Sequence, residues 1–182
     1  MHVVLFGPPG SGKGSQAKQL VNYGYIHFSP GEILRHHIKQ GTGLGKQLEE
    51  IVKTGQLVPD YVVDNFFLDV LKNNKPVVFD GYPRTVEQLS NFSNYVSKGQ
   101  AIVINLVVPE ETLIQRMLNR AALEGRSDDT PESIRKRLEN YQSITAPVLD
   151  GFKKLDFSIQ DFDGTRTIEE TFAEIKKLLN LV

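Results

Sequence analysis

The chain has 182 residues, of which 40% are hydrophobic and 24% are charged, and its formal net charge is -1 at pH 7. This length and composition predict one soluble globular domain, and the near-neutral charge argues against a nucleic-acid-binding surface. The absence of cysteine excludes disulfides and thiolate metal sites, and no stretch has the length and apolarity of a signal peptide or a membrane span. We therefore expect a cytoplasmic protein without nucleic-acid or membrane partners, in which any polyphosphate site is locally basic.

A glycine-rich segment follows the first apolar run of the chain. Residues 2–6 are apolar apart from the first, and residues 7–15 contain four glycines and Lys13. This order predicts a strand, a phosphate-binding loop and a helix that starts near Lys13, because glycines let backbone N–H groups approach an anion at a helix N-terminus. The hydroxyl of Ser15 stands one place later than in the pattern G-x-x-x-x-G-K-[ST]. Switch GTPases and most ATPases place their Mg²⁺-binding hydroxyl where this chain has Gly14.

Helical and strand-like segments alternate along the rest of the chain. Hydrophobic spacing, glycine and proline predict strands at 2–6, 25–28, 77–80, 101–107 and 155–159, and helices at about 13–23, 30–40, 43–54, 60–72, 85–98, 109–122, 131–149 and 168–179. Alternation of this kind is typical of an α/β fold, here a five-stranded parallel sheet flanked by helices in three α/β/α layers. We treat residues 1–182 as a single domain, with residues 29–59 and 122–130 as insertions beside the site.

Several polar residues have a local interpretation. Ser29 and Glu32 have the spacing of a capping box, and Asp60 is expected to cap the helix that follows it. Asp128 and Asp129 could also be caps. Asp80 ends a buried parallel strand, and we expect it at the site because ligands bind at the carboxyl ends of such strands.

Arginine placement is the second functional signal. Five of the eight arginines lie between residues 116 and 137, and a guanidinium binds phosphate oxygens two at a time. Arg137 has no acidic residue three or four positions away, so an ion pair along its own helix does not explain it. Arg116 and Arg120 are like charges at helical spacing, which is unfavourable unless an anion lies between them. We expect three of these arginines to bind an anion: Arg120, Arg126 and Arg137.

Together these motifs resemble the adenylate kinases, a family of nucleoside monophosphate kinases, from Gly7 to about Ile168. Residues 80–84 match the motif D-G-[FY]-P-R, residues 125–129 with Arg137 match the lid arginines, and residues 55–60 resemble the loop that lines the AMP base. The resemblance implies the P-loop NTPase fold, a short lid, a monomer and Mg²⁺-dependent transfer in which ATP and AMP give two ADP. A short lid without cysteines excludes the zinc-carrying lid.

The resemblance also implies roles for individual residues. The catalytic set is Lys13, Arg84, Arg120, Arg126 and Arg137. The ATP-binding set is Gly10, Ser11, Gly12, Lys13, Gly14, Ser15, Arg116, Arg120 and Arg166. The AMP-binding set is Pro30, Arg35, Gln56, Leu57, Val58, Gly81, Tyr82, Pro83, Arg84, Gln88, Arg126 and Arg137. Within these sets, Gln88 would read the edge of adenine, and Asp80 would orient Mg²⁺ through its water ligands.

The sequence departs from the family pattern at one position that bears on the acceptor. The family usually has Ser-Thr-Gly-Asp where this chain has Pro30 in place of the threonine, whose hydroxyl lies near the AMP base. Pyrimidine monophosphate kinases also lack that threonine, but they place asparagines after the Pro-Arg pair, where Thr85 and Gln88 stand here. Gln88 therefore favours AMP. A further alternative is an ATP-binding regulator without chemistry, against which the complete set of arginines argues; a switch GTPase would need an Asn-Lys-x-Asp motif, which is absent.

Overall fold

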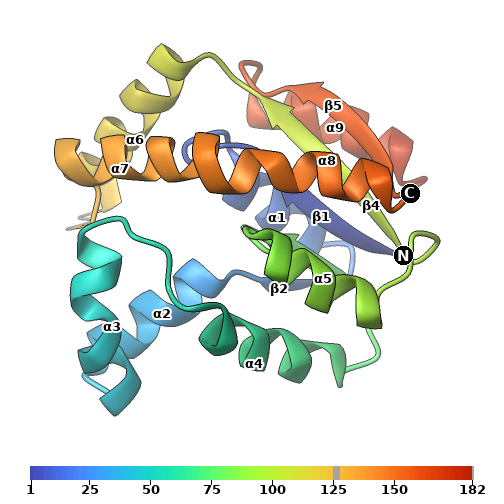
Figure 1. Ribbon diagram of the computed structural model, residues 1–182. Helices are drawn as coiled ribbons and strands as arrows, with labels where there is room; N and C mark the ends of the chain where they lie inside the picture. Colours follow the sequence, from blue (N-terminus) through green and yellow to red (C-terminus); the bar gives the residue numbers. More distant parts are fainter. Residues whose placement is uncertain (125–127, 182) are drawn as a thin grey trace.

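A parallel sheet of five strands lies at the centre of the protein (Figure 1). The computed structural model describes residues 1–124 and 128–181. The strands are β1 (His2–Phe6), β2 (Ile26–Phe28), β3 (Val77–Asp80), β4 (Ala101–Val107) and β5 (Ser158–Asp163), in the spatial order β2-β3-β1-β4-β5. Val4 of β1 lies opposite Phe79 of β3 and Val103 of β4. The predicted five-stranded parallel sheet is confirmed. The chain places β2 and β3 on one side of β1 and β4 and β5 on the other, so the strand order reverses next to β1.

Helices cover both faces of the sheet, as predicted. Side chains alternate along β1, so Val3 and Leu5 face α1 (Lys13–Val21) and α9 (Ile168–Leu178). Val4 and Phe6 face the other way, toward α4 (Asp60–Leu71), α5 (Val86–Tyr95) and α8 (Ala146–Lys154). The two apolar clusters bury nearly all of β1, β3 and β4, as expected for central strands of a parallel sheet. No helix in the described ranges combines the length and apolarity that a membrane crossing requires.

Two pairs of helices lie outside these layers. The helices α2 (Pro30–Lys39) and α3 (Gly43–Lys53) have a small core of their own, formed by Leu34 and Leu48 with Val62 of α4. The helices α6 (Glu110–Glu124) and α7 (Pro131–Asn140) pack through another cluster, which contains Met117 and Leu138. In Figure 1 the two pairs lie on the same side of the molecule, α2 and α3 below and α6 and α7 above. Each pair therefore keeps its shape through local apolar contacts beside the sheet.

The predicted helix at 131–149 ends later in the structure, and the strand after it begins later. Helix α7 passes through one π-helical turn, Tyr141–Thr145, into α8, which continues to Lys154. Gly151 lies within α8 and does not end it. A Cβ at this position would clash with Leu89, so the glycine lets α8 pack closely against α5. The strand therefore begins at Ser158 rather than at residue 155, after a turn in which Asp156 has φ 57°.

One predicted helix cap is correct in position but forms no capping box, and a second is wrong. Ser29 is the N-cap residue of α2, with Pro30 at the first helical position, but its side chain makes no cap hydrogen bond, and the Glu32 carboxylate lies 3.7 Å from Nδ1 of His27. Asp60 is the first residue of α4 rather than its cap, which is Pro59. Its carboxylate is free of the helix end and reaches α5, where it accepts hydrogen bonds described below.

Replacement of Phe92 by alanine tests the core between the sheet and α5. The Phe92 ring is fully buried and lies 5.3 to 5.9 Å, centroid to centroid, from the rings of Phe79, Phe67 and Phe152. We expect Phe92→Ala to lower the free energy of unfolding by about 3–5 kcal/mol, through lost contacts and a residual cavity. Urea unfolding measures this, with Ser90→Ala at an exposed position of the same helix as the control, expected within about 0.5 kcal/mol of the parent. A Phe92→Ala loss under about 1 kcal/mol would contradict this description of the core.

Candidate active site

The loop after β1 leaves the first turn of α1 open to an anion. Gly12 is the N-cap residue of α1 with φ 98°, a left-handed conformation that suits glycine, and it has no side chain to cap the helix. The first turn of α1 contains no acidic residue. Its N–H groups and the positive end of the helix dipole are therefore available at the carboxyl edge of β1, where the strand order reverses.

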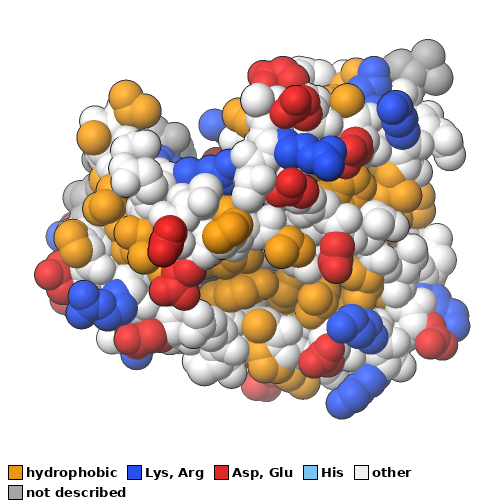
Figure 2. Space-filling model, turned by 90° about the horizontal axis from the view of Figure 1, so that it is seen from above, with side chains coloured by type: hydrophobic (Ala, Val, Ile, Leu, Met, Phe, Trp, Pro, Cys, Tyr) orange, Lys and Arg blue, Asp and Glu red, His pale blue; other side chains and the backbone are white. Residues whose placement is uncertain are grey.

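A cavity of about 720 Å³ opens at this edge of the sheet, a volume typical of small-molecule sites. Among the described residues, eight basic and two acidic side chains line it, although the whole chain carries a net charge of -1. Seen from above, the surface is hollowed beside a protruding segment, and Lys and Arg side chains gather at the bottom of the hollow (Figure 2). The expectation that any polyphosphate site would be locally basic is thus met.

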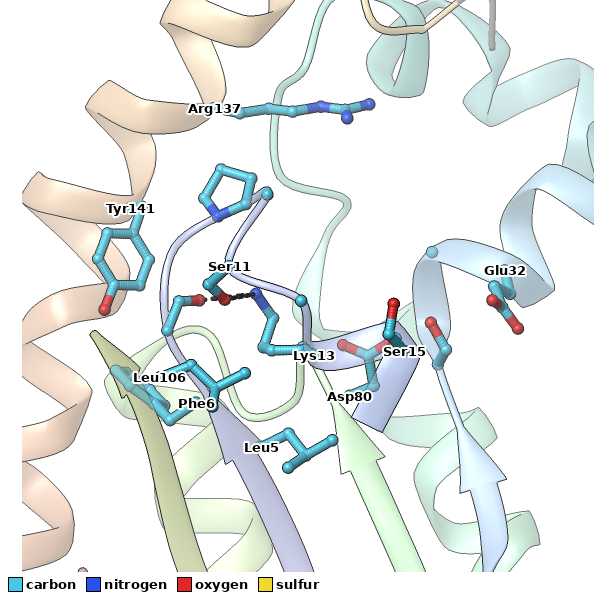
Figure 3. A pocket seen from close by; sticks show the side chains of 18 of the residues that line it. Leu5, Phe6, Ser11, Lys13, Ser15, Glu32, Asp80, Leu106, Arg137 and Tyr141 are labelled. Carbon is cyan, nitrogen blue, oxygen red and sulfur yellow. Dashed lines mark hydrogen bonds between the residues drawn. The ribbon is translucent and has the colours of Figure 1, made fainter. Parts of the chain in front are cut away.

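Lys13 bends back over the loop from which it comes (Figure 3). Its Nζ donates hydrogen bonds to the carbonyl oxygens of Gly7 and Pro8, both at 2.8 Å, and lies 3.4 Å from Oγ of Ser11. Burial lowers the pKa of Lys13 to about 8; Asp80 opposes this shift, while the nearby charges of Arg84 and Arg120 add to it. The ammonium is therefore held in place where an additional anion would stabilise it.

Asp80 lies next to the start of α1, at the end of β3. One of its oxygens is 3.3 Å from Nε2 of His27, and the space that a Cβ on Gly14 would take lies 3.4 Å from the same oxygen. Burial raises the pKa of Asp80, but the His27 hydrogen bond and the charges of Lys13 and Arg84 outweigh it and hold the pKa below its usual value. The predicted placement of Asp80 at the site, rather than as a helix cap, is the one the structure has.

Two adjacent aspartates hold the arginines on the far side of the cavity. The carboxylate of Asp129, whose side chain is fully buried, accepts two hydrogen bonds from Arg120, at 2.8 and 3.0 Å, and one from Arg137 at 2.6 Å. Asp128 accepts a second hydrogen bond from Arg137, and Nη1 of Arg35 lies 3.8 Å from it. Arg137 extends from α7 over the phosphate loop (Figure 3). Paired charges of this kind can be buried because each guanidinium has a carboxylate partner.

Arg116 and Arg120 are held by different acceptors. Arg116 donates to the carbonyl oxygens of Gly164, at 2.7 Å, and Thr165, at 3.4 Å, in the turn after β5. Arg120 is bound to Asp129, as described above. Each of the two like charges therefore has its own acceptor in the protein, which offsets their repulsion; binding of an anion there stays a prediction.

The acceptor side of the cavity contains Arg84 and Gln88. Nε of Arg84 donates to the carbonyl oxygen of Gly81 at 2.8 Å, and the outer nitrogens of the guanidinium have no hydrogen-bond partner within residues 1–124 and 128–181. Gln88 lines the cavity although only 3% of it is exposed, and both ends of its amide are bound. Pro30, Gln56, Leu57 and Val58 also line the cavity.

Nearly all of the predicted site residues line this one cavity, and three need separate comment. Tyr82 does not line it: its ring is in the core, 1% of the residue is exposed, and its hydroxyl donates to Asp64 at 2.8 Å. Arg166 lines the cavity, but its guanidinium pairs with Glu174 at 2.6 Å and lies 3.6 Å from Asp163. Arg126 falls outside the described residues.

Four residues of the site were not identified from the sequence: Asp60, Asp128, Asp129 and Gln16. The three aspartates lie in the segments 55–60 and 125–129 that carry the resemblance, but the sequence assigns them no role beyond helix caps; their contacts with Gln88, Arg120 and Arg137 place them at the site. The signal that could have identified Gln16 is its position directly after the glycine-rich segment of residues 7–15. Its Nε2 donates to the carbonyl oxygen of Ile168 at 3.1 Å, and its buried Oε1 has no partner in the described part of the chain.

A parallel sheet with a phosphate loop after its first strand, faced by arginines from α2, α6 and α7, defines the class of P-loop phosphotransferases. The family model for adenylate kinase matches residues 5–157 of this chain. An adenylate kinase of Parabacteroides distasonis is 41% identical over 189 aligned positions, which cover 100% of this chain and 99% of that protein. Adenylate kinases of Porphyromonas gingivalis and Thermus thermophilus are 40% and 39% identical, and each alignment covers at least 96% of both chains. The chain therefore belongs to the adenylate kinase family.

The lowered pKa of Lys13 predicts a pH dependence for the capture of ATP. In the free enzyme Lys13 loses its proton as the pH rises through about 8, so the loop loses its point charge above that pH. We expect kcat/KM for ATP, at saturating AMP, to fall by up to tenfold per pH unit above about 8, because this ratio reports ionisations of the free enzyme. The value of kcat should stay level to higher pH, since bound phosphates raise the pKa of the ammonium. A kcat/KM profile that is flat to pH 9.5 would contradict the lowered pKa of Lys13 or its part in binding ATP.

Replacement of Gly81 tests the position of Arg84. Gly81 has φ 75°, and a Cβ on it would lie 2.6 Å from Nη2 of Arg84, so an alanine displaces the guanidinium and strains the backbone. We expect Gly81→Ala to lower kcat at least tenfold and the free energy of unfolding by about 1 kcal/mol. The control is Gly99→Ala, where a Cβ meets no atom within 4 Å. Steady-state kinetics and thermal unfolding measure both; a Gly81→Ala enzyme with the parent's kcat would show that the position of Arg84 is not critical.

Proposed function

We propose that this adenylate kinase binds ATP on the phosphate loop and AMP between Arg84 and Gln88, and transfers the terminal phosphoryl group between them. The single observation that carries this proposal is the cavity itself, which eight basic side chains line in a chain that is close to neutral. A polyanion that is bound along the length of the cavity accounts for this excess of basic side chains. The reaction is the reversible one in which ATP and AMP give two ADP, the activity after which the family is named.

The donor half consists of the loop and the lid arginines. The open first turn of α1 supports binding of the β- and γ-phosphates, with the Lys13 ammonium as their counter-charge. Arg120 and Arg137 reach the same space from the opposite wall, held by Asp129. The two guanidinium groups are placed to stabilise negative charge on the group in transfer. Arg116 completes the donor side through its position at the turn after β5.

The acceptor half lies next to α5. Arg84 supports binding of the AMP phosphate because its outer nitrogens point to no partner in the described residues, and Arg35 lines the same cavity. Gln88 and the segment Gln56, Leu57 and Val58 would surround the base. The AMP phosphate then approaches the donor in line, with its charge balanced by arginine on both sides.

The chemistry needs no general base, since the AMP phosphate is itself the nucleophile. The side chains instead hold two nucleotides in line and neutralise charge on the equatorial oxygens. Water has to be kept away from the γ-phosphate, because hydrolysis would compete with transfer. The contact of residues 29–59 with α7 supports this exclusion of water. Asn140, at the end of α7, donates to the carbonyl oxygen of Gly55 at 3.1 Å.

The residues near the loop fit a magnesium ion held mainly by substrate. Asp80 is kept ionised beside Lys13, and Mg²⁺ in phosphate-transfer sites commonly has one or two carboxylates, waters and phosphate oxygens as ligands. The described residues include no group of three or more acidic or histidine side chains that could hold a metal without substrate. When bound, Mg²⁺ neutralises charge on the transferring phosphates. Asp80 would orient its water ligands.

We also propose that the enzyme acts as a monomer in the cytoplasm. The phosphate loop, the arginines of α6 and α7 and the residues at the start of α5 line one continuous cavity, which supports a site that is complete within a single copy.

A panel of acceptors tests the proposed reaction. With Mg²⁺ and ATP, we expect kcat/KM for AMP to exceed the values for CMP, UMP and GMP at least tenfold, because the amide of Gln88 matches the edge of adenine. Initial rates in a coupled assay for ADP give the comparison. Equal or faster turnover of CMP would assign the chain to pyrimidine monophosphates, and ATP binding without transfer to any acceptor would make it a regulator.

A further inference from the structure

The amide of Gln88 is held at both ends by groups of the protein. Its Oε1 accepts a hydrogen bond of 2.7 Å from the backbone N–H of Arg84, and its Nε2 donates one of 2.7 Å to Oδ1 of Asp60. The other oxygen of Asp60 accepts from the hydroxyl of Thr85 at 2.8 Å, and that hydroxyl accepts from the N–H of Gln88. Asp60, the first residue of α4, thus links this helix to the start of α5. It holds the side chain of Gln88, which is almost completely buried.

These partners determine which way round the amide stands. A half-turn of the Gln88 amide would bring Oε1 against the carboxylate of Asp60 and Nε2 against the N–H of Arg84. Two hydrogen bonds would become one contact between acceptors and one between donors, and neither polar group would be satisfied. The orientation in the structure is therefore strongly preferred. Each end of the amide still has a second donor hydrogen or a second lone pair for a ligand.

The orientation of such an amide decides which purine it can pair with. Adenine presents a donor, its 6-amino group, next to an acceptor, N1, and an amide pairs with both through its oxygen and nitrogen. Hypoxanthine and guanine present the reverse order, an acceptor at O6 next to a donor at N1, and they pair with the same amide after a half-turn. A glutamine that rotates freely would accept both kinds of base, whereas one that is locked accepts one.

We propose that Asp60 is a positioning residue that locks the Gln88 amide and thereby makes the acceptor site select 6-amino purines over 6-oxo purines. This inference rests on the proposed function, because it requires that Gln88 faces the acceptor base. A carboxylate suits the purpose because it only accepts hydrogen bonds, so it can hold Nε2 but never Oε1. The backbone N–H of Arg84 acts in the same sense on the other end of the amide.

The substitution Asp60→Asn tests the lock. Asparagine keeps the size of the side chain and can present either its oxygen or its amino group to Gln88, so both orientations of the Gln88 amide become satisfied on this side. The measurement is kcat/KM for AMP and for inosine 5′-monophosphate, whose base differs only by the 6-oxo group and the hydrogen on N1. We expect the preference for AMP to fall about tenfold, the worth of roughly one hydrogen bond to a charged group. A general loss of structure would lower both values together and leave their ratio unchanged.

The control is Asp64→Asn, the same substitution one helical turn further along α4. Asp64 accepts from the hydroxyl of Tyr82 at 2.8 Å and does not contact Gln88, so we expect the parent's ratio. If Asp60→Asn fails to fold, Asp60→Ala is measured instead; it removes the acceptor and leaves Arg84 N–H alone, and a severalfold fall in the ratio is expected. A ratio equal to the parent's in the folded variant overturns the proposal.

A third variant separates this inference from the function on which it rests. Gln88→Leu removes the amide and should reduce kcat/KM for AMP strongly. If Gln88→Leu leaves AMP turnover intact, the assignment of Gln88 to the acceptor base is wrong, and the lock has no substrate to act on. If Gln88→Leu impairs AMP but Asp60→Asn does not change the ratio, only the lock is wrong.

Discussion

Repulsion among the basic side chains of the cavity is the constraint to which the rest of the structure responds. Lys13, Arg84 and Arg120 are close enough that the two arginines contribute, after burial, to the lowered pKa of the lysine. Three carboxylates offset this charge: Asp80 beside Lys13, and Asp128 and Asp129 on the opposite wall. They do not neutralise the whole cavity, since basic residues remain in excess. A bound polyphosphate removes the remaining repulsion, so affinity for anions follows from the way the protein holds its own charges.

The pair Asp128 and Asp129 also connects parts of the chain that the core does not. Arg120 belongs to α6, Arg137 to α7 and Arg35 to the insertion, and all three meet these two carboxylates. The apolar cluster of α2 and α3 continues toward the sheet, because Val58 and Phe66 pack against both it and the cluster on the α4–α5 face, whereas the cluster of α6 and α7 shares no residue with either. Charge pairing thus joins α2 to α6 and α7 over the cavity, in addition to the hydrogen bond from Asn140 to the carbonyl oxygen of Gly55. Phosphate groups compete for the same guanidinium groups, which couples occupancy of the cavity to contact between these segments.

The parts that the sequence predicts are those with local causes. The phosphate loop, the strand that ends in Asp80 and the apolar faces of the helices all follow from patterns within a few residues. Arg137 could be singled out because its own helix offers it no partner, yet Asp129 could not be named as the partner from that absence. The strand at Ser158–Asp163 is a polar edge strand, and the preceding helix runs through a glycine required for packing, so both boundaries were misplaced. Partners that meet only through the fold, as Asp60 and Gln88 do, leave no local pattern.

If Gln88 faces the acceptor base, as proposed above, selection of that base depends on the pair Asp60 and Gln88 more heavily than the family pattern implies. Where other members of the family have a threonine hydroxyl near the base, this chain has Pro30, which has neither a hydroxyl nor an N–H to offer. In the proposed site the base therefore has one polar contact fewer than the family pattern implies, and Gln88 is the principal side chain proposed to distinguish its edge. Discrimination by a single amide is effective only if the amide cannot rotate, because a rotated amide satisfies the competing base equally well. The carboxylate of Asp60 and the N–H of Arg84 supply that restriction from two directions, so the loss at residue 30 is offset by rigidity at residue 88.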